Sequence, residues 1–209
     1  MPQMPDSPAP HPAWLFLRSN HEGVLSADGE VEKVRFVIDG ATGRVVLPVH
    51  PSVLGAEELV MFVPDEAPQM GPELQLLITR SDLDADSEPA DRWKAYHGDP
   101  LQTRWISCVI DGGKFEGDVV EPESLALPNP LLAAEPRLCK RLNADKPALA
   151  RACERLGKVA VREPLAVGVD PTGIDVRARF GTVHLPFEPL AWTEGDAARS
   201  LDAVLGATA

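Results

Sequence analysis

Residues 21–49, HEGVLSADGEVEKVRFVIDGATGRVVLPV, carry the pattern that decides the fold of the first half of the chain. Val34, Phe36 and Ile38 alternate with Lys33, Arg35 and Val37, which is the two-residue period of a half-buried β-strand. Asp-Gly pairs at 28–29 and 39–40 interrupt the pattern, and such pairs favour the tight turns of β-hairpins. The stretch therefore predicts consecutive strands joined by short turns.

Further short strands are predicted on the carboxyl side of this stretch, at residues 59–63 and 74–79. Residues 104–111 and 114–121 flank Gly112-Gly113, and this glycine pair predicts another hairpin turn. Short strands separated by glycine and proline favour an antiparallel barrel or sandwich over a parallel sheet.

Two helical segments are expected beside this barrel. Residues 13–20 predict one or two turns of helix covering a barrel end, because their apolar side chains share one helical face. Residues 92–97 predict a short helical turn from which Trp93 and Tyr96 cover the barrel. Residues 1–12 hold five prolines and no apolar run, so they predict a flexible lead-in and no signal peptide.

The composition changes at Pro122, which predicts a second domain with its boundary near Pro128. Residues 123–143 are expected to form short turns, because three prolines interrupt them. The elements expected after them are a helix capped by Asp145, strands at 165–169, 174–180 and 182–187, and a last helix that begins near Thr193.

Charge and composition exclude several classes of function. The chain has 209 residues and a formal net charge of −12, and a field of that sign repels phosphate backbones and anionic lipid surfaces. We therefore expect no nucleic-acid partner and no membrane association. No stretch approaches the roughly 18 apolar residues of a membrane-spanning helix, and the lack of a targeting motif favours a cytoplasmic location. The cysteines, Cys108, Cys139 and Cys153, form no C-x-x-C pair and are expected to be buried, reduced thiols.

The stretches at 21–49 and 104–120 together resemble the split barrel of the pyridoxamine-phosphate-oxidase-like, flavin-binding superfamily. Residues 141–190 are similar to the small domain of unknown function that follows split barrels in heme-utilisation proteins, through VGVDPTGIDVRAR at 167–179 and LPFEPL at 185–190. The resemblance covers about residues 13–206. It implies an α+β fold with an N-terminal antiparallel split β-barrel, residues 13–127, followed by a small α-β-β-β-α domain, residues 128–209.

The resemblance implies a homodimer with its ligand at the subunit interface. Members of the superfamily bind FMN, and the heme-utilisation branch binds heme, so both cofactors are candidates. A plant protein with the same two modules binds glutamyl-tRNA reductase, which leaves a protein partner as an alternative.

Two positions depart from the family pattern. The small domain usually begins Asn-Ala-Asp-His, whereas Lys146 stands here in the fourth place. The loop that grips the FMN phosphate usually offers Lys or Arg beside a hydroxyl or amide, whereas residues 50–58, HPSVLGAEE, offer Ser52 and two glutamates. A phosphate requires guanidinium, ammonium or clustered amide donors, so this loop argues against FMN.

Three cations on the predicted barrel strands are candidates for binding an anionic ligand. Arg35 and Arg44 are expected on adjacent strands, and Lys33 shares a face with Arg35. Guanidinium and ammonium groups bind phosphates or the propionates of heme. The alternative is that the three residues are the polar outer face of a barrel strand.

Two histidines and a tryptophan complete the candidate site. His50 follows a strand end, where a neutral imidazole can bind heme iron, or it is a solvated loop residue. His97 ends the 92–97 segment and lines an interface or interacts with the helix dipole. Trp105 is a stacking partner for a flat ligand or a buried barrel aromatic. His184 and His21 are expected at exposed surface positions.

No motif in the sequence identifies an enzyme. The histidines have no H-E-x-x-H spacing, which gives no support for a metal site, and there is no G-x-S-x-G nucleophile motif. Three functions therefore remain open: a ligand-binding split-barrel homodimer, a non-enzymatic partner-binding or regulatory protein, and an FMN-dependent oxidoreductase.

Overall fold

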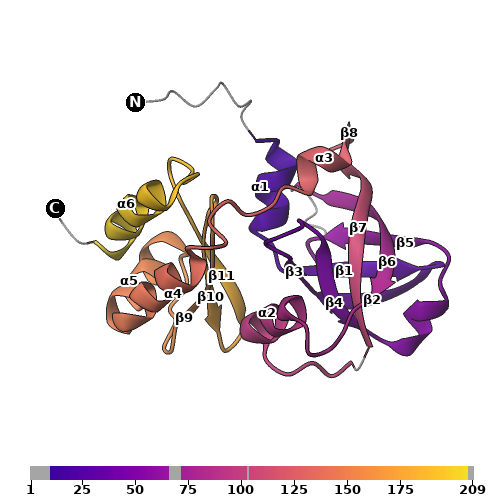
Figure 1. Cartoon of the computed structure of the whole chain (residues 1–209), viewed down its shortest axis with the longest axis horizontal. Helices are drawn as coiled ribbons and strands as arrows, with labels where there is room; N and C mark the ends of the chain where they lie inside the picture. The colour runs from indigo at the N-terminus through magenta and orange to yellow at the C-terminus, as the bar shows by residue number, and fades with distance from the viewer. Residues whose placement is uncertain (1–9, 66–71, 103, 207–209) are drawn as a thin grey trace.

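The structure is a computed structural model that describes residues 10–65, 72–102 and 104–206. These residues form two β-sheets and six α-helices (Figure 1), which confirms the expected α+β class. None of the helices in these ranges is long and apolar enough to cross a membrane. Most of the 1–12 segment predicted to be flexible lies outside the described residues, and Pro12 already begins helix α1.

The larger sheet is the antiparallel barrel that the sequence predicts. Its strands run in the order β2-β1-β5-β6-β7-β4-β3, with β8 paired to β7, and the sheet curls so that β2 comes close to β4. The strands are β1 (Glu22–Ala27), β2 (Glu30–Arg35), β3 (Val37–Ile38), β4 (Val45–Val49), β5 (Leu59–Val63), β6 (Leu74–Asp82), β7 (Arg104–Phe115) and β8 (Asp118–Val120).

Both Asp-Gly pairs form the expected turns. Asp28 and Gly29 have φ angles of 49° and 90°, so both lie in the left-handed region that a two-residue hairpin of type I′ requires. At the second turn the backbone N–H of Asp39 donates to the carbonyl of Arg44 over 2.8 Å, which joins β3 to β4.

Gly112-Gly113, in contrast, is not a turn, and that prediction was wrong. Strand β7 continues through both glycines, which pair with Leu77 and Leu76 of β6, and the hairpin turn lies at Glu116 and Gly117 instead. The physical reason is packing. A Cβ on Gly113 would lie 2.8 Å from Cδ1 of Leu125 in helix α3 (Pro122–Leu125), so this glycine lets α3 approach the strand.

The interior of the barrel is closed by apolar side chains and two helices. Phe36, Met61 and Ile106 are fully buried in this core. Helix α1 (Pro12–Arg18) covers one end and buries Leu17 completely, as predicted for residues 13–20. Helix α2 (Glu88–His97) is longer than the predicted turn, because Pro89 stands in its first turn where no N–H is needed. A short 3-10 helix, η1 (Pro51–Gly55), follows β4.

The second sheet has its own core and its own helices. Its strands are β9 (Leu165–Asp170), β10 (Gly173–Ala178) and β11 (Gly181–Pro186), and its helices are α4 (Glu135–Ala144), α5 (Lys146–Leu156) and α6 (Glu194–Leu205). Residues 123–143 were expected to form only turns, but residues 123–125 belong to α3 and residues 135–143 all belong to α4. Pro136 does not break this helix because it stands in the first turn.

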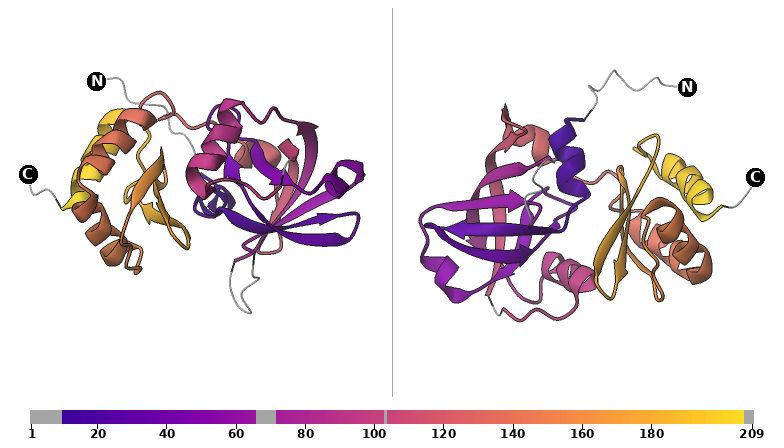
Figure 2. Two further views of the ribbon diagram at one scale, coloured as in Figure 1. Left: turned by 90° about the horizontal axis from the view of Figure 1, so that it is seen from below. Right: turned by 180° about the vertical axis from the view of Figure 1, so that it is seen from behind.

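The three-stranded sheet lies between its helices and the barrel (Figure 2). On β10, Ile174 and Val176 point into the core formed with α4, α5 and α6. Asp175 and Arg177 alternate with them and therefore face the barrel side, where α2 lies. A sheet face that looks solvent-exposed in sequence is thus covered by the first half of the chain.

Candidate functional site

Helix α2 fixes two aromatic rings against the end of β2. The indole N–H of Trp93 donates to the carbonyl of Arg35 over 2.8 Å, and Nε2 of His97 lies 3.1 Å from the carbonyl of Phe36. The two ring centroids are 4.7 Å apart. Because both rings are bonded to backbone atoms, they form a rigid wall.

This wall belongs to a cavity of about 320 Å³ at the seam between β2 and β4. Three residues predicted from sequence, Lys33, Arg35 and His97, meet there. The other lining residues come from β2, from β4, from α2 and from the segment after α2, and they are Glu32, Val34, Pro48, Trp93, Asp99, Pro100, Leu101 and Gln102.

The cavity has exposed cations at its mouth and a neutral ring in its wall. Nζ of Lys33 bonds to Asp65 over 3.0 Å, and Nε of Arg35 bonds to Glu22 over 3.1 Å. Exposed ion pairs of this kind contribute about 0–1 kcal/mol, so an anionic ligand can displace them. Burial lowers the pKa of His97 to about 4, although its bond to the Phe36 carbonyl acts in the opposite direction. His97 is therefore uncharged near neutral pH.

The remaining sequence-predicted residues lie elsewhere. Trp105 is 6% exposed and packs edge-on against Trp93, with centroids 5.4 Å apart, so it supports the wall from behind. Val37 pairs with Val46, a register that places Arg35 beside position 48 and Arg44 beside position 39. Arg35 and Arg44 are thus separated by about four residues of strand, roughly 13 Å.

His50 lines a different cavity, of about 660 Å³, between the β1–β2 hairpin and η1. Its ring accepts a hydrogen bond from the backbone N–H of Ser52 and so caps η1. Asp28, Glu30 and Glu32 also line this space. Three carboxylates around one imidazole disfavour an anionic ligand.

A buried polar cluster joins α2 to the three-stranded sheet, and it centres on Asp175. Tyr96 donates from its hydroxyl to Oδ2 over 2.9 Å, and Nδ1 of His184 lies 2.8 Å from Oδ1. Nε2 of His21 lies 3.1 Å from the same Oδ1, a contact that is not aligned as a hydrogen bond. The predictions that His21 and His184 are surface residues were wrong, because the barrel and the sheet bury both side chains to 8% and 12% exposure.

The cluster continues into α4 through a chain of charged groups. Arg92 donates to the hydroxyl of Tyr96 over 2.9 Å and to Oε2 of Glu135 over 2.8 Å. Oε1 of Glu135 accepts from the backbone N–H of Val169 over 3.0 Å. One continuous set of bonds thus connects α2, α4, β9, β10 and β11.

Burial and charge act against each other within this cluster. Burial alone would raise the pKa of Asp175, but the electrostatic contacts with His21 and His184 and the hydrogen bond with His184 outweigh it and hold the pKa well below its usual range. Burial disfavours the charged form of His184, but its bond to Asp175 raises its pKa above the ordinary value. The contact between the two side chains therefore favours the imidazolium form of His184 and the carboxylate form of Asp175.

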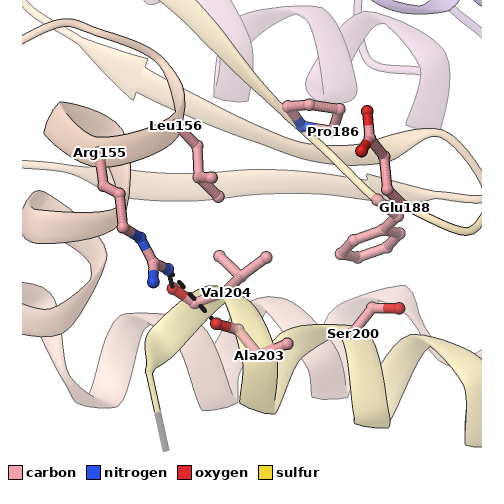
Figure 3. Close-up of a pocket in the computed structure, with 8 residues that line it drawn as sticks. Arg155, Leu156, Pro186, Glu188, Ser200, Ala203 and Val204 are labelled. Atoms are coloured by element: carbon pink, nitrogen blue, oxygen red, sulfur yellow. Dashed lines mark hydrogen bonds between the residues drawn. The ribbon is translucent and has the colours of Figure 1, made fainter.

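Two further cavities lie beside the end of β11 and the residues that follow it, 187–190. One, of about 520 Å³, is mostly apolar and lies between α1 and the strand, with Phe16, Phe115 and His184 in its lining. The other, of about 280 Å³, lies between α5, α6 and the strand (Figure 3). Its one arginine, Arg155, is already bonded to the carbonyls of Ala203 and Val204 at the end of α6.

The residues at the start of the second half, Asn143 and Asp145, have structural roles. The amide of Asn143 donates to the carbonyl of Ala166 over 2.9 Å and accepts from its N–H over 2.8 Å, which anchors α4 to β9. Asp145 caps α5 by accepting from the N–H of Ala148 over 2.9 Å. Lys146, the residue after Asp145, is exposed.

Comparisons with known proteins support the fold, but they do not identify an activity. No family model matches the chain, and no curated protein is significantly similar to it. Among solved structures, the chain is similar to the protein Atu2129 of unknown function from Agrobacterium tumefaciens, with a TM-score of 0.72 and 18% identity over 97% of this chain and 100% of that chain. Campylobacter jejuni ChuZ gives a TM-score of 0.42 and 12% identity over 53% of this chain and 58% of that chain, a likeness too weak to support an argument.

Proposed function

We propose that this protein is a ligand-binding split-barrel homodimer, with its ligand in the cavity beside α2 at the subunit interface. The observation that carries this proposal is the convergence of Lys33, Arg35, Trp93 and His97 on one cavity. Two cations with weak partners stand beside two fixed aromatic rings. This combination suits a flat ring system that carries acidic groups.

Heme fits these residues better than FMN does. Lys33 and Arg35 would hold carboxylate groups, and Trp93 would stack on a ring face. The loop expected to grip the FMN phosphate has its amide donors occupied, since the N–H groups of Glu57 and Glu58 donate to the carboxylate of Asp28. The carboxylate of Asp28, which lies at this loop, would also repel a phosphate. Heme would supply iron chemistry when bound, but no catalytic step follows from the residues themselves.

The cavity is small for such a ligand, which is a reason to propose a second subunit. Its volume of about 320 Å³ is at the lower end of the range for ligand pockets, about 300–1,000 Å³. Strand β2 forms one wall of the cavity and carries Val31, which is 67% exposed. A copy of the protein that docked on this side would cover the open part of the cavity.

The outer face of β1, β2, β5, β6 and β7 offers an apolar surface for that copy. Leu77 is 49% exposed and Val109 is 38% exposed. Val60 pairs directly with Leu77 in the neighbouring strand, and Val24 pairs with Phe62. We call the six residues Val24, Val31, Val60, Phe62, Leu77 and Val109 the outer apolar face; an apolar surface of this kind on a barrel favours burial against a partner.

A hemin titration followed by visible absorbance tests the ligand. The wild type is expected to shift the Soret band and to quench tryptophan fluorescence, and the double variant Lys33→Met and Arg35→Met is expected to bind at least about tenfold more weakly. Arg44→Met is the matched control, because Arg44 lies outside the cavity, and its affinity should not change. Equal affinity in all three proteins would overturn the assignment of this cavity, and tight FMN binding would overturn the preference for heme.

A partner-binding role is the second candidate. Leu101 at the rim of the cavity is 96% exposed, and Glu32 and Asp99 partly cancel the charges of Lys33 and Arg35. These features suit contact with another protein. The observation that would favour this role is a monomer that binds neither hemin nor FMN.

A further inference from the structure

Helix α2 is shared between the two halves of the chain. Trp93 and His97 line the barrel cavity, whereas Arg92 and Tyr96 bond to the second half. The guanidinium of Arg177 on β10 donates to the carbonyl of Ala95 over 2.7 Å, near the carboxyl end of α2. Carbonyls at a helix end have no partners within the helix, so Arg177 completes α2 from the other half of the chain.

Asp175 is the buried carboxylate that joins Tyr96 of α2 to His184 of β11. It is buried to 6% exposure, and it accepts from Tyr96 on α2 while it pairs with His184 on β11. A buried carboxylate of this kind is stable only while it is paired and hydrogen-bonded. The titratable and charged groups that surround it are Arg18 of α1, His21 of the segment after α1, Arg92, Tyr96 and His97 of α2, Glu135 and Cys139 of α4, Asp170 of β9 and His184 of β11.

We propose that the Asp175 cluster is a proton-sensitive latch, in which the bonds of Asp175 to Tyr96 and to His184 hold the three-stranded sheet against α2 and thereby hold the wall of the barrel cavity in place. When the imidazolium loses its proton, the buried carboxylate loses its nearest countercharge. The sheet then separates more readily from α2, and Trp93 and His97 lose the helix that positions them.

The direction of the pH effect follows from His184. Its pKa is higher in the folded protein than in a free side chain, so the ion pair contributes fully below a pH of about 6.5 and is lost as the pH rises through the raised pKa. Asp175 stays ionised over this range, because its pKa is lowered. The latch therefore weakens toward alkaline pH.

Hydrogen exchange of the α2 backbone amides, measured on the full chain without ligand, tests the latch. Asp175→Asn removes the charge and keeps the shape, so the amides of α2 are expected to exchange about ten- to a hundredfold faster. Asp202→Asn is the matched control, because it removes the exposed ion pair between Asp202 and Arg141 in the same half of the chain. Equal α2 exchange in the two folded variants would overturn the proposal.

Tyr96→Phe keeps the proposal testable if Asp175→Asn does not fold. It removes one hydroxyl from the cluster, and the same acceleration confined to α2 and the facing strand β10 is expected. An unchanged α2 in this folded variant would also count against the latch.

The pH dependence is a separate arm of the test. After correction for intrinsic exchange, the opening of α2 in the wild type should increase from pH 6 to pH 9 in parallel with the NMR titration of His184. In His184→Gln the opening should be high and should not vary with pH. A wild type whose corrected opening is flat over this range would overturn the pH sensitivity. No step uses a ligand, so the outcome is independent of the hemin experiment.

Discussion

Gly168 on β9 lies so close to Tyr96 on α2 that a Cβ at position 168 would be 1.7 Å from the phenolic oxygen. The same Cβ would lie 3.2 Å from Oδ2 of Asp175. The absence of a side chain at this one position allows the hydroxyl of Tyr96 to reach the carboxylate between the two halves of the chain.

Gly168→Ala is therefore expected to destabilise the protein. Neither Tyr96 nor Asp175 can move away without giving up a buried hydrogen bond, so we expect a loss of at least about 2 kcal/mol in the free energy of unfolding. Urea denaturation measures it. Gly55→Ala is the matched control, because a Cβ at Gly55 meets no atom within 4 Å; similar midpoints for the two variants would contradict the packing of α2 on β9.

Stability should fall as the pH decreases from about 6.5 to 4, and His97 should account for part of this. Its pKa in the folded protein is about 4, so in this range the unfolded chain binds a proton that the folded protein does not bind. Stability therefore rises with pH across the window, by at most about 3 kcal/mol from this residue. Denaturation of the wild type and of His97→Gln at several pH values measures it, and identical slopes for the two proteins would show that His97 titrates normally.

Leu77→Lys should dissociate the proposed homodimer. Leu77 lies at the centre of the outer apolar face and is already half exposed in the single chain, so lysine there should leave the fold intact while it places a charge in the interface. Sedimentation is expected to give twice 22.5 kDa for the wild type and 22.5 kDa for the variant. Phe180→Lys between β10 and β11, where Phe180 is 58% exposed in the other half of the chain, is the control and should stay dimeric. A monomeric wild type at micromolar concentration would refute the dimer.

The three thiols should be protected from alkylation in the native protein. Cys108 and Cys153 are fully buried, and burial raises the pKa of Cys108 and of the partly exposed Cys139 to about 12. At pH 8 the thiolate fraction of Cys139 should be about a thousandfold below that of a free cysteine. Mass spectrometry after iodoacetamide treatment is expected to find three alkylated cysteines only in denaturant. Rapid labelling of Cys139 in the native protein would contradict its raised pKa.

Local patterns predict the strands well, because a two-residue period and an Asp-Gly turn act within a few residues of chain. The same rules fail at Gly112-Gly113, where the glycines serve a contact with Leu125 and not a turn. They fail again at residues 123–143, where the position of Pro136 within the helix, and not its presence, decides the outcome. Both predictions failed because a short window of sequence contains neither the contact with Leu125 nor the start of helix α4.

The candidate site was predictable only in part. Lys33 and Arg35 could be chosen because they share one face of a predicted strand, and His97 because it ends the helical segment expected beside the barrel; all three do line one cavity. The Asp175 cluster could not be found in this way, because its members are far apart in the sequence, with 79 positions between Tyr96 and Asp175 alone, and its two histidines look like ordinary surface residues. The available signal was the alternation of β10, which places Asp175 and Arg177 on one face; it does not say that another part of the chain covers that face.

The position of α2 also limits how such chains can recombine. The helix precedes β7 in the first half of the sequence, yet its contacts with Arg177, Asp175 and Glu135 match it to the second half. A chimera that joined this barrel to the small domain of a distant relative would bring together surfaces that had diverged separately. Grafts that transfer α2 together with residues 128–206 should be the ones that yield a soluble, cooperatively folded protein.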